Sequence, residues 1–186
     1  MTRIAPLEPP YEPAVAERLA AMMPPRVPPI ALFRAFVRNM PMAEAMGGWG
    51  GYELSSRLSL TLRDREIVID RTCARCGCEY EWGVHVMFVA DRAGLSAPQV
   101  ASLTHGGASD GCWTDERDRL LIEGVDALHD TSAITDGLWP RMTRLFTEEQ
   151  MLDLMMLCGW YHAISFAANG ARVALEEGEP RFADVS

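Results

Sequence analysis

Positive charge is scarce in this sequence of 186 residues. Lys and Arg together number 17, against 26 Asp and Glu, which gives a formal net charge of −9 at pH 7. An acidic surface repels phosphate backbones and anionic lipid headgroups. We therefore expect neither a nucleic acid nor a membrane among the partners of this protein.

A continuous apolar leader is also missing, because Pro6, Glu8, Pro9 and Pro10 interrupt the first ten residues. A signal peptide needs an apolar core of roughly 7–15 residues, so no export is expected. The five cysteines are an odd number, and three of them lie in the short segment Cys73–Cys78. This pattern suits a reducing compartment better than a secreted disulfide framework. We expect a cytoplasmic protein.

Sustained alternation of apolar and polar residues, the pattern of a half-buried strand, does not occur. Capping-box patterns mark helix starts instead, at Thr61, Ser96 and Thr147. The helix that begins after Thr61 is expected to break at Cys76-Gly77. The most apolar stretch, 151–171, carries Asp153, His162 and Asn169, which would be costly in a bilayer, so it predicts a buried helix. The sequence therefore predicts an all-α bundle of about six to eight helices.

Proline is concentrated at the N-terminus, where eight of the twelve prolines precede residue 30. Proline opposes a continuous helix, so residues 1–29 are expected to form an extended arm with one short helix at about 14–22. A helical domain at 30–176 and a C-terminal tail at 177–186 complete the predicted organisation. The four glycines in Met46–Gly51 disfavour a helix and predict a loop there.

One segment, Cys73–His85, concentrates titratable side chains within an apolar region. A helix is expected from about Glu79 to Ala93. At about 100° per residue, Cys78, Glu81 and His85 fall within a sector about 60° wide on this helix. The spacing therefore predicts that a thiol, a carboxylate and an imidazole face one cavity.

The environment of these three groups acts on them in opposite directions. Cys78 is placed at a helix N-terminus, where unpaired N–H groups favour the thiolate and lower its pKa. Glu81 in the same turn opposes a second negative charge. His85 beside them is expected to hold the compensating positive charge or to shuttle a proton. Such a set suits general acid/base chemistry near neutral pH.

The run Cys76–His85, preceded by Arg63–Glu66 and followed by Arg92–Ser96, resembles the carboxymuconolactone decarboxylase family, which includes the alkylhydroperoxidase D proteins. The similarity extends over about 33–169, and its distinctive motif covers 66–85. The resemblance implies an all-α fold that assembles as trimers or hexamers, with a pocket between helices.

In the alkylhydroperoxidase branch the motif is a Glu, eleven residues, a Cys, two residues, a second Cys, three residues and a His. This sequence matches the motif at Glu66, Cys78 and His85, and it departs from the motif at Glu81, which replaces the second Cys. The two cysteines of that branch supply a redox pair. Here only one cysteine occupies the matching face of the helix.

The decarboxylase branch acts without metal or organic cofactor on an unsaturated carboxylactone, and the loss of CO₂ leaves a carbanion that must be protonated. The resemblance thus implies a cofactor-independent enzyme for a small organic acid or lactone. We assign His85 as proton donor or shuttle, Glu66 as its orienting or basic partner, and Glu81 as an acid/base group. Cys78 is expected in the same catalytic site. The residues expected to line the substrate pocket are Tyr80, Trp82 and His162.

Three alternatives stay open. In the first, the Cys78 thiolate attacks a hydroperoxide and becomes a sulfenic acid, which Cys76 or Cys73 resolves. In the second, these three cysteines and His85 bind zinc, although their spacing does not repeat the usual paired knuckles. We therefore expect no metal. The third is a non-catalytic oligomeric module. The other histidines, which have no partners at ligand spacing and are expected to be structural or exposed, are His105, His129 and His162.

Overall fold

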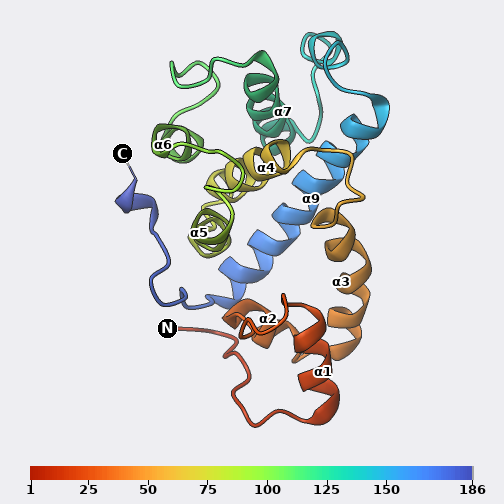
Figure 1. Cartoon of the computed structure of the whole chain (residues 1–186), viewed down its shortest axis with the longest axis vertical. Helices are drawn as coiled ribbons and strands as arrows, with labels where there is room; N and C mark the ends of the chain where they lie inside the picture. Colours follow the sequence, from red (N-terminus) through yellow and green to blue (C-terminus); the bar gives the residue numbers. More distant parts are fainter. Residues whose placement is uncertain (186) are drawn as a thin grey trace.

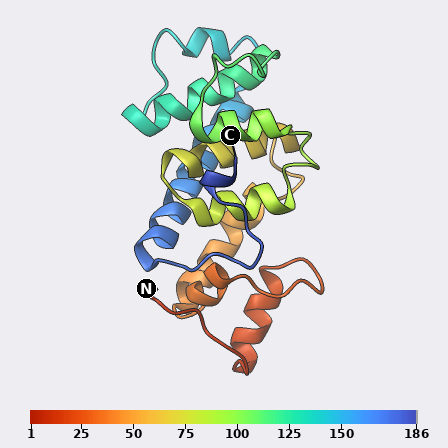
Figure 2. The ribbon, with the colours of Figure 1, turned by 90° about the vertical axis from the view of Figure 1, so that its left-hand side faces the viewer.

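The computed structural model describes residues 1–185, which form nine α-helices, one 3-10 helix and no strand. The molecule is elongated, and α9 (Glu148–Ala171) runs diagonally through it (Figure 1). Turned by 90°, the N-terminal arm lies toward one end of the molecule and α7 (Glu116–Thr131) toward the other (Figure 2). The predicted all-α class is confirmed. The nine α-helices of the described residues are one more than the largest number predicted, six to eight, and they include α8 (Trp139–Met142), which is a single turn.

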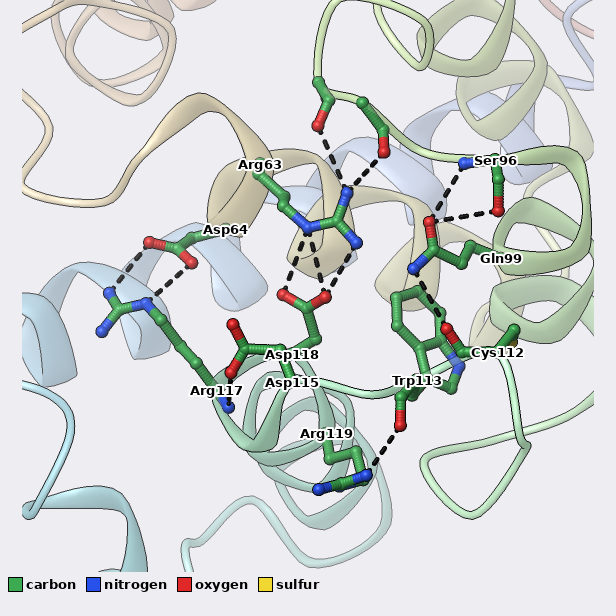
Figure 3. Close-up of polar contacts among 12 residues, drawn as sticks. Arg63, Asp64, Ser96, Gln99, Cys112, Trp113, Asp115, Arg117, Asp118 and Arg119 are labelled. Atoms are coloured by element: carbon green, nitrogen blue, oxygen red, sulfur yellow. Dashed lines mark hydrogen bonds and ion pairs between the residues drawn. The ribbon is translucent and has the colours of Figure 1, made fainter.

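Helices α4 (Leu62–Arg75) and α7 (Glu116–Thr131) lie side by side with the same chain direction. Three arginines of α4 bind three aspartates of α7, and the partners in each pair are 55 residues apart: Arg63–Asp118, Arg71–Asp126 and Arg75–Asp130. A constant separation requires two helices in parallel register. Arg117 of α7 binds Asp64 in return, at 2.9 Å, which closes the N-terminal ends of the two helices (Figure 3).

The turn between α4 and α5 (Glu79–Phe88) follows the predicted local pattern. Thr61 caps α4 through a capping box, and α4 ends at Arg75. Gly77 then adopts a φ of +59°, which glycine reaches without a steric penalty. Cys78 is the N-cap of α5. The predicted helix end at Ala93 is corrected, because Val89 leaves helical geometry at a φ of −129° and turns follow.

The glycine-rich segment is helical, which corrects the predicted loop: it lies inside α3 (Met40–Glu53). Close packing explains the glycines. A Cβ atom on Gly50 would lie 2.6 Å from the ring of Trp160, and one on Gly47 would collide with the guanidinium of Arg18. These tertiary contacts outweigh a helix-propensity cost of about 1 kcal/mol for each glycine.

The N-terminal arm folds back on its own chain. It contains α1 (Pro13–Ala21), close to the expected short helix. After α2 (Ala31–Phe36) the chain enters α3, and a small second core forms from Leu19, Val37 and Ala43. The first residues of the arm reach the end of α9, where the Arg3 N–H donates to Ala171 O at 2.8 Å.

The main core lies where α9 meets α4, α5 and α7. Helix α6 (Ala97–His105) and the 3-10 helix (Phe182–Asp184) complete the described elements. Among residues 1–185, α9 is the one helix long and apolar enough to cross a membrane, and half of that apolar window is buried inside the protein. Its buried face matches the predicted core helix. Its outer face carries large exposed side chains: Leu152, Met156 and Phe166.

Candidate functional site

The centre of the site is His85, whose ring nitrogens both have partners. Nδ1 lies 2.7 Å from Oε2 of Glu66 on α4. Nε2 lies 3.0 Å from the hydroxyl of Tyr161 on α9 and 3.6 Å from Oε1 of Glu81, one turn earlier on α5. Three helices therefore bring polar side chains to one buried imidazole.

Charge complementarity sets the protonation state of this group. Burial alone would lower the pKa of His85, but the charge and hydrogen bond of Glu66, together with Glu81, raise it to about 10. Burial would raise the pKa of Glu66, yet the opposite charges of His85 and Arg65 hold it below its ordinary value. At neutral pH the pair is an imidazolium and a carboxylate, and both nitrogens of His85 donate.

Glu66 is fixed on both carboxylate oxygens. Oε2 accepts from His85, and Oε1 accepts from Nε of Arg65 at 2.8 Å. The Glu66 side chain has no solvent exposure, and His85 is 7% exposed. A carboxylate held from both sides positions the imidazole rigidly.

A pocket of about 250 Å³ opens in front of this pair, and Glu81 and Tyr161 form part of its wall. Neither His85, Glu66 nor Cys78 lines it. Oε2 of Glu81 has no hydrogen-bond partner within residues 1–185. The remaining wall comes from α1, α2, α3 and α9 and is mostly apolar, with these larger members: Met22, Phe33, Phe36, Met46, Leu54, Trp160 and Ile164.

One cation, Arg18 of α1, also lines this pocket. Its guanidinium donates from Nη2 to Ala43 O. Its Nε atom is buried and has no partner in the described part of the chain. The pocket therefore combines apolar walls with one carboxyl group, one phenol and one guanidinium.

Cys78 lies apart from the pocket. It has no solvent exposure, and it forms no hydrogen bond with the side chain of Glu81 or of His85 within the described residues. Burial raises the pKa of Cys78 to about 11, although the Glu81 backbone N–H and the Ser165 hydroxyl act in the opposite direction. The predicted lowering of this pKa is thus corrected, because desolvation outweighs the effect of the helix N-terminus.

None of the three residues expected to line the substrate pocket lines this one. The Tyr80 hydroxyl accepts from the Leu32 N–H at 3.0 Å and donates to Glu176, so it ties the C-terminal segment to α2. Trp82 is fully buried against Phe182, with ring centroids 4.9 Å apart. His162 packs beside His129 instead.

Sequence reasoning missed Tyr161, Arg18 and Asp70. The first two come from α9 and the arm, and no spacing connects them with α5. Asp70 follows Glu66 by one helical turn, so its position on the same face was accessible to periodicity. It is fully buried, and both its carboxylate oxygens lack a partner in residues 1–185. Burial, and then the charge of Glu66, raise the pKa of Asp70 well above its ordinary value.

Comparison with protein families supports the resemblance seen in the sequence. Residues 41–122 match the carboxymuconolactone decarboxylase family, and this range contains the whole 66–85 motif. The suspected family is thereby confirmed over residues 41–122. A search of curated proteins gives no significant match.

Three solved structures share the fold. An uncharacterized peroxidase-related protein from Silicibacter sp. TM1040 superposes with a TM-score of 0.79 at 13% identity, over 96% of each chain. A putative antioxidant defence protein AhpD from Agrobacterium tumefaciens superposes with a TM-score of 0.67 at 21% identity, over 76% of this chain and 95% of the other. The debrominase Bmp8 in complex with 2,3,4-tribromopyrrole superposes with a TM-score of 0.75 at 13% identity, over 95% of this chain and 93% of the other. At these identities the likeness establishes the fold alone.

Proposed function

Because residues 41–122 belong to the carboxymuconolactone decarboxylase family, we propose that this protein is a cofactor-independent acid/base enzyme for a small organic acid or lactone. One observation carries the proposal. Glu81, and not a cysteine, stands between the pocket and the buried pair of His85 and Glu66. A proton held on His85 thus has a titratable carrier at the pocket wall.

The reaction that fits this arrangement is decarboxylation followed by protonation at carbon. The bond between carbon and the carboxylate breaks, CO₂ leaves, and the electron pair passes into the conjugated system of the substrate as an enolate. Glu81 relays a proton from Nε2 of His85, 3.6 Å away, to that carbon. His85 becomes neutral and regains its proton from water. Glu66 keeps the imidazole oriented throughout.

Tyr161 is suited to the negative oxygen that develops in this step. Its hydroxyl accepts from Nε2–H of the charged His85 at 3.0 Å, so its own proton is available to the substrate. Burial raises the pKa of Tyr161 well above its ordinary value, so the phenol stays protonated. A buried donor of this kind stabilises an enolate oxygen more strongly than water does.

The pocket wall supports a substrate that is anionic and otherwise apolar. Arg18 brings a guanidinium group to the pocket wall, which suits a carboxylate, and the aromatic walls include Phe33, Phe36 and Trp160. The volume of about 250 Å³ lies just under the usual range of roughly 300–1,000 Å³ for ligand sites. A compact carboxylic acid or carboxylactone matches both features.

A thiol-dependent peroxidase is the second candidate, because three free cysteines lie around the turn between α4 and α5: Cys73 in α4, Cys76 at its C-cap and Cys78 at the N-cap of α5. The state of the Cys78 thiol argues against this second candidate. The raised pKa and complete burial of Cys78 both suppress the thiolate that must attack a peroxide.

The test is CO₂ release from a panel of unsaturated lactone carboxylates and related acids, with Glu81→Gln and Cys78→Ser as matched variants. We expect Glu81→Gln to abolish turnover and Cys78→Ser to retain most of it. Free thiols are counted in parallel after stoichiometric hydroperoxide. Loss of thiols in the wild type, together with an inactive Cys78→Ser variant, would replace this proposal with the thiol mechanism. Absence of turnover on every substrate would favour a non-catalytic module.

We further propose a homo-oligomer, trimeric or hexameric, located in the cytoplasm. The exposed face of α9 supports the assembly, because Leu152, Met156 and Phe166 are 60%, 50% and 70% exposed along one stripe. Small residues at Gly159 and Ala163 flatten the stripe between them. A continuous apolar surface of this kind commonly marks an interface between proteins. Five free cysteines within the described chain suit a reducing compartment.

A further inference from the structure

A cysteine and two histidines meet where α4, α7 and α9 come together. Cys76 caps the end of α4, His129 lies in the last turn of α7, and His162 lies within α9. Their Sγ, Nδ1 and Nε2 atoms all lie within 4.8 Å of one another, and all three side chains are half-buried. The acid/base site uses none of them.

The distances within this cluster suit a tetrahedral metal ion. Nδ1 of His129 lies 3.0 Å from Nε2 of His162 and 4.0 Å from Sγ of Cys76. Around zinc, bond lengths of about 2.3 Å to sulfur and about 2.05 Å to nitrogen place two nitrogens about 3.4 Å apart and a sulfur and a nitrogen about 3.6 Å apart. Each of these two distances therefore has to change by about 0.4 Å, which small side-chain rotations achieve, for the three atoms to coordinate one ion.

Hydrogen bonds around the cluster already orient these atoms. Nδ1 of His162 donates to Cys158 O at 2.8 Å, which leaves Nε2 as a lone pair directed at His129. A histidine that binds metal normally donates its other N–H to a carbonyl in this way. Asn169 donates to Cys76 O at 3.0 Å and holds the end of α4 in place.

We propose that Cys76, His129 and His162 bind a divalent transition-metal ion of the zinc type, with the fourth position left to water. A thiolate and two imidazoles prefer zinc or cobalt to magnesium or calcium, which require oxygen ligands. The ion replaces the thiol proton and the proton shared by the two histidines. Because the ligands come from three helices, bound metal also joins the C-terminal ends of α4 and α7 to α9.

This site differs from the zinc set considered from the sequence, which combined three neighbouring cysteines with His85. That set does not assemble, because His85 is engaged by Glu66 and Tyr161. Sequence spacing could not find the new set, since its members lie 33 to 86 residues apart, in three separate helices. It also departs from the expectation that the protein holds no metal.

The experiment uses the reduced full-length protein, stripped of metal with a chelator and titrated with Zn²⁺ or Co²⁺. We expect one equivalent of metal per chain, a rise in melting temperature with Zn²⁺, and a thiolate-to-cobalt charge-transfer band with Co²⁺. His129→Gln and His162→Gln should lower the affinity at least tenfold, and Cys76→Ser should abolish the charge-transfer band. Cys112→Ser and His105→Gln, which change a cysteine and a histidine outside the cluster, should leave binding intact.

Two results would overturn the proposal. One is the absence of stoichiometric binding to the wild type, which needs no variant to fold. The other is binding that survives in the cluster variants or disappears in Cys112→Ser, which would assign the metal elsewhere. Neither result bears on decarboxylation, because metal content and turnover are measured separately.

Discussion

The Nδ1 atom of His85 lies 2.7 Å from Oε2 of Glu66, and the pair is enclosed by α4, α5 and α9. This contact turns an imidazole that ordinarily titrates near neutral pH into a stable cation behind a pocket. Desolvation acts against that charge, so the charged state depends on the partner carboxylate. If His85 supplies the proton of the proposed reaction, that supply depends on Glu66.

The first prediction concerns the pKa of His85, which is about 10 in the wild type. In Glu66→Gln the carboxylate charge is lost while burial remains, so the pKa should fall by several units. Histidine-labelled NMR titration measures it, and the His85→Gln spectrum identifies the resonance. An unchanged pKa in Glu66→Gln would show that another group stabilises the cation.

The second prediction concerns stability against pH. The raised pKa of His85 adds stability below its unfolded value of 6.5, and this stability is lost as pH rises through about 10. The lowered pKa of Glu66 adds stability above its unfolded value of 4.5, and this is lost as pH falls. Urea unfolding should therefore show the largest gap between wild type and Glu66→Gln at about pH 4.5–6.5, with narrowing on both sides. A gap that stays constant from pH 4 to pH 10 would contradict the ion pair.

The third prediction concerns Asp70. Its pKa is raised on folding, so the folded protein must take up a proton above the unfolded value of 3.8, and this uptake costs up to about 1.4 kcal/mol per pH unit. Asp70→Asn removes that cost without changing the side-chain shape. Relative to wild type, the variant should gain stability as pH rises from 4 toward neutrality. A difference independent of pH would mean that Asp70 is ionised in the folded state.

Local sequence signals predict the parts of the fold that depend on neighbouring residues. They fail where contacts with residues distant in the sequence determine whether a segment is helical. The caps at Thr61 and Thr147 and the break at Gly77 depend on neighbours within a few residues, and they were correctly predicted. The four glycines of α3 predict a loop by local propensity, and this prediction is wrong because Trp160 and Arg18, which pack on them, lie far away in the chain.

The site residues likewise fall into two groups, those that lie on one helix and those that come from distant elements. Glu81 and His85 are one turn apart on a single helix, so periodicity placed them together. Tyr161 and Arg18 reach the pocket from other elements, which no helical spacing reports. The pKa of Cys78 was predicted in the wrong direction, because its burial depends on tertiary packing that outweighs the helix N-terminus.

The fourth prediction concerns assembly through the outer face of α9. Met156→Glu places a charge at the centre of the apolar stripe, where a contact with another copy would have to desolvate it. Light scattering after gel filtration should show a shift from the oligomer to smaller species. Leu145→Glu changes a 41% exposed leucine outside the stripe and should keep the wild-type mass. An oligomer that persists in Met156→Glu would place the interface elsewhere.

The fifth prediction tests why α3 carries glycines. A Cβ on Gly50 meets the Trp160 ring at 2.6 Å, so Gly50→Ala should force α3 and α9 apart and destabilise the protein by about 1–3 kcal/mol. Gly48→Ala is the matched control in the same helix, because nothing lies within 4 Å of its Cβ position. The control should instead gain about 0.5–1 kcal/mol from higher helix propensity.

Urea unfolding measures the stability of both variants, and equal effects of the two substitutions would mean that contact with Trp160 does not require glycine. Since Gly50 and Trp160 both line the pocket, Gly50→Ala should also weaken ligand binding, whereas Gly48→Ala should leave it unchanged.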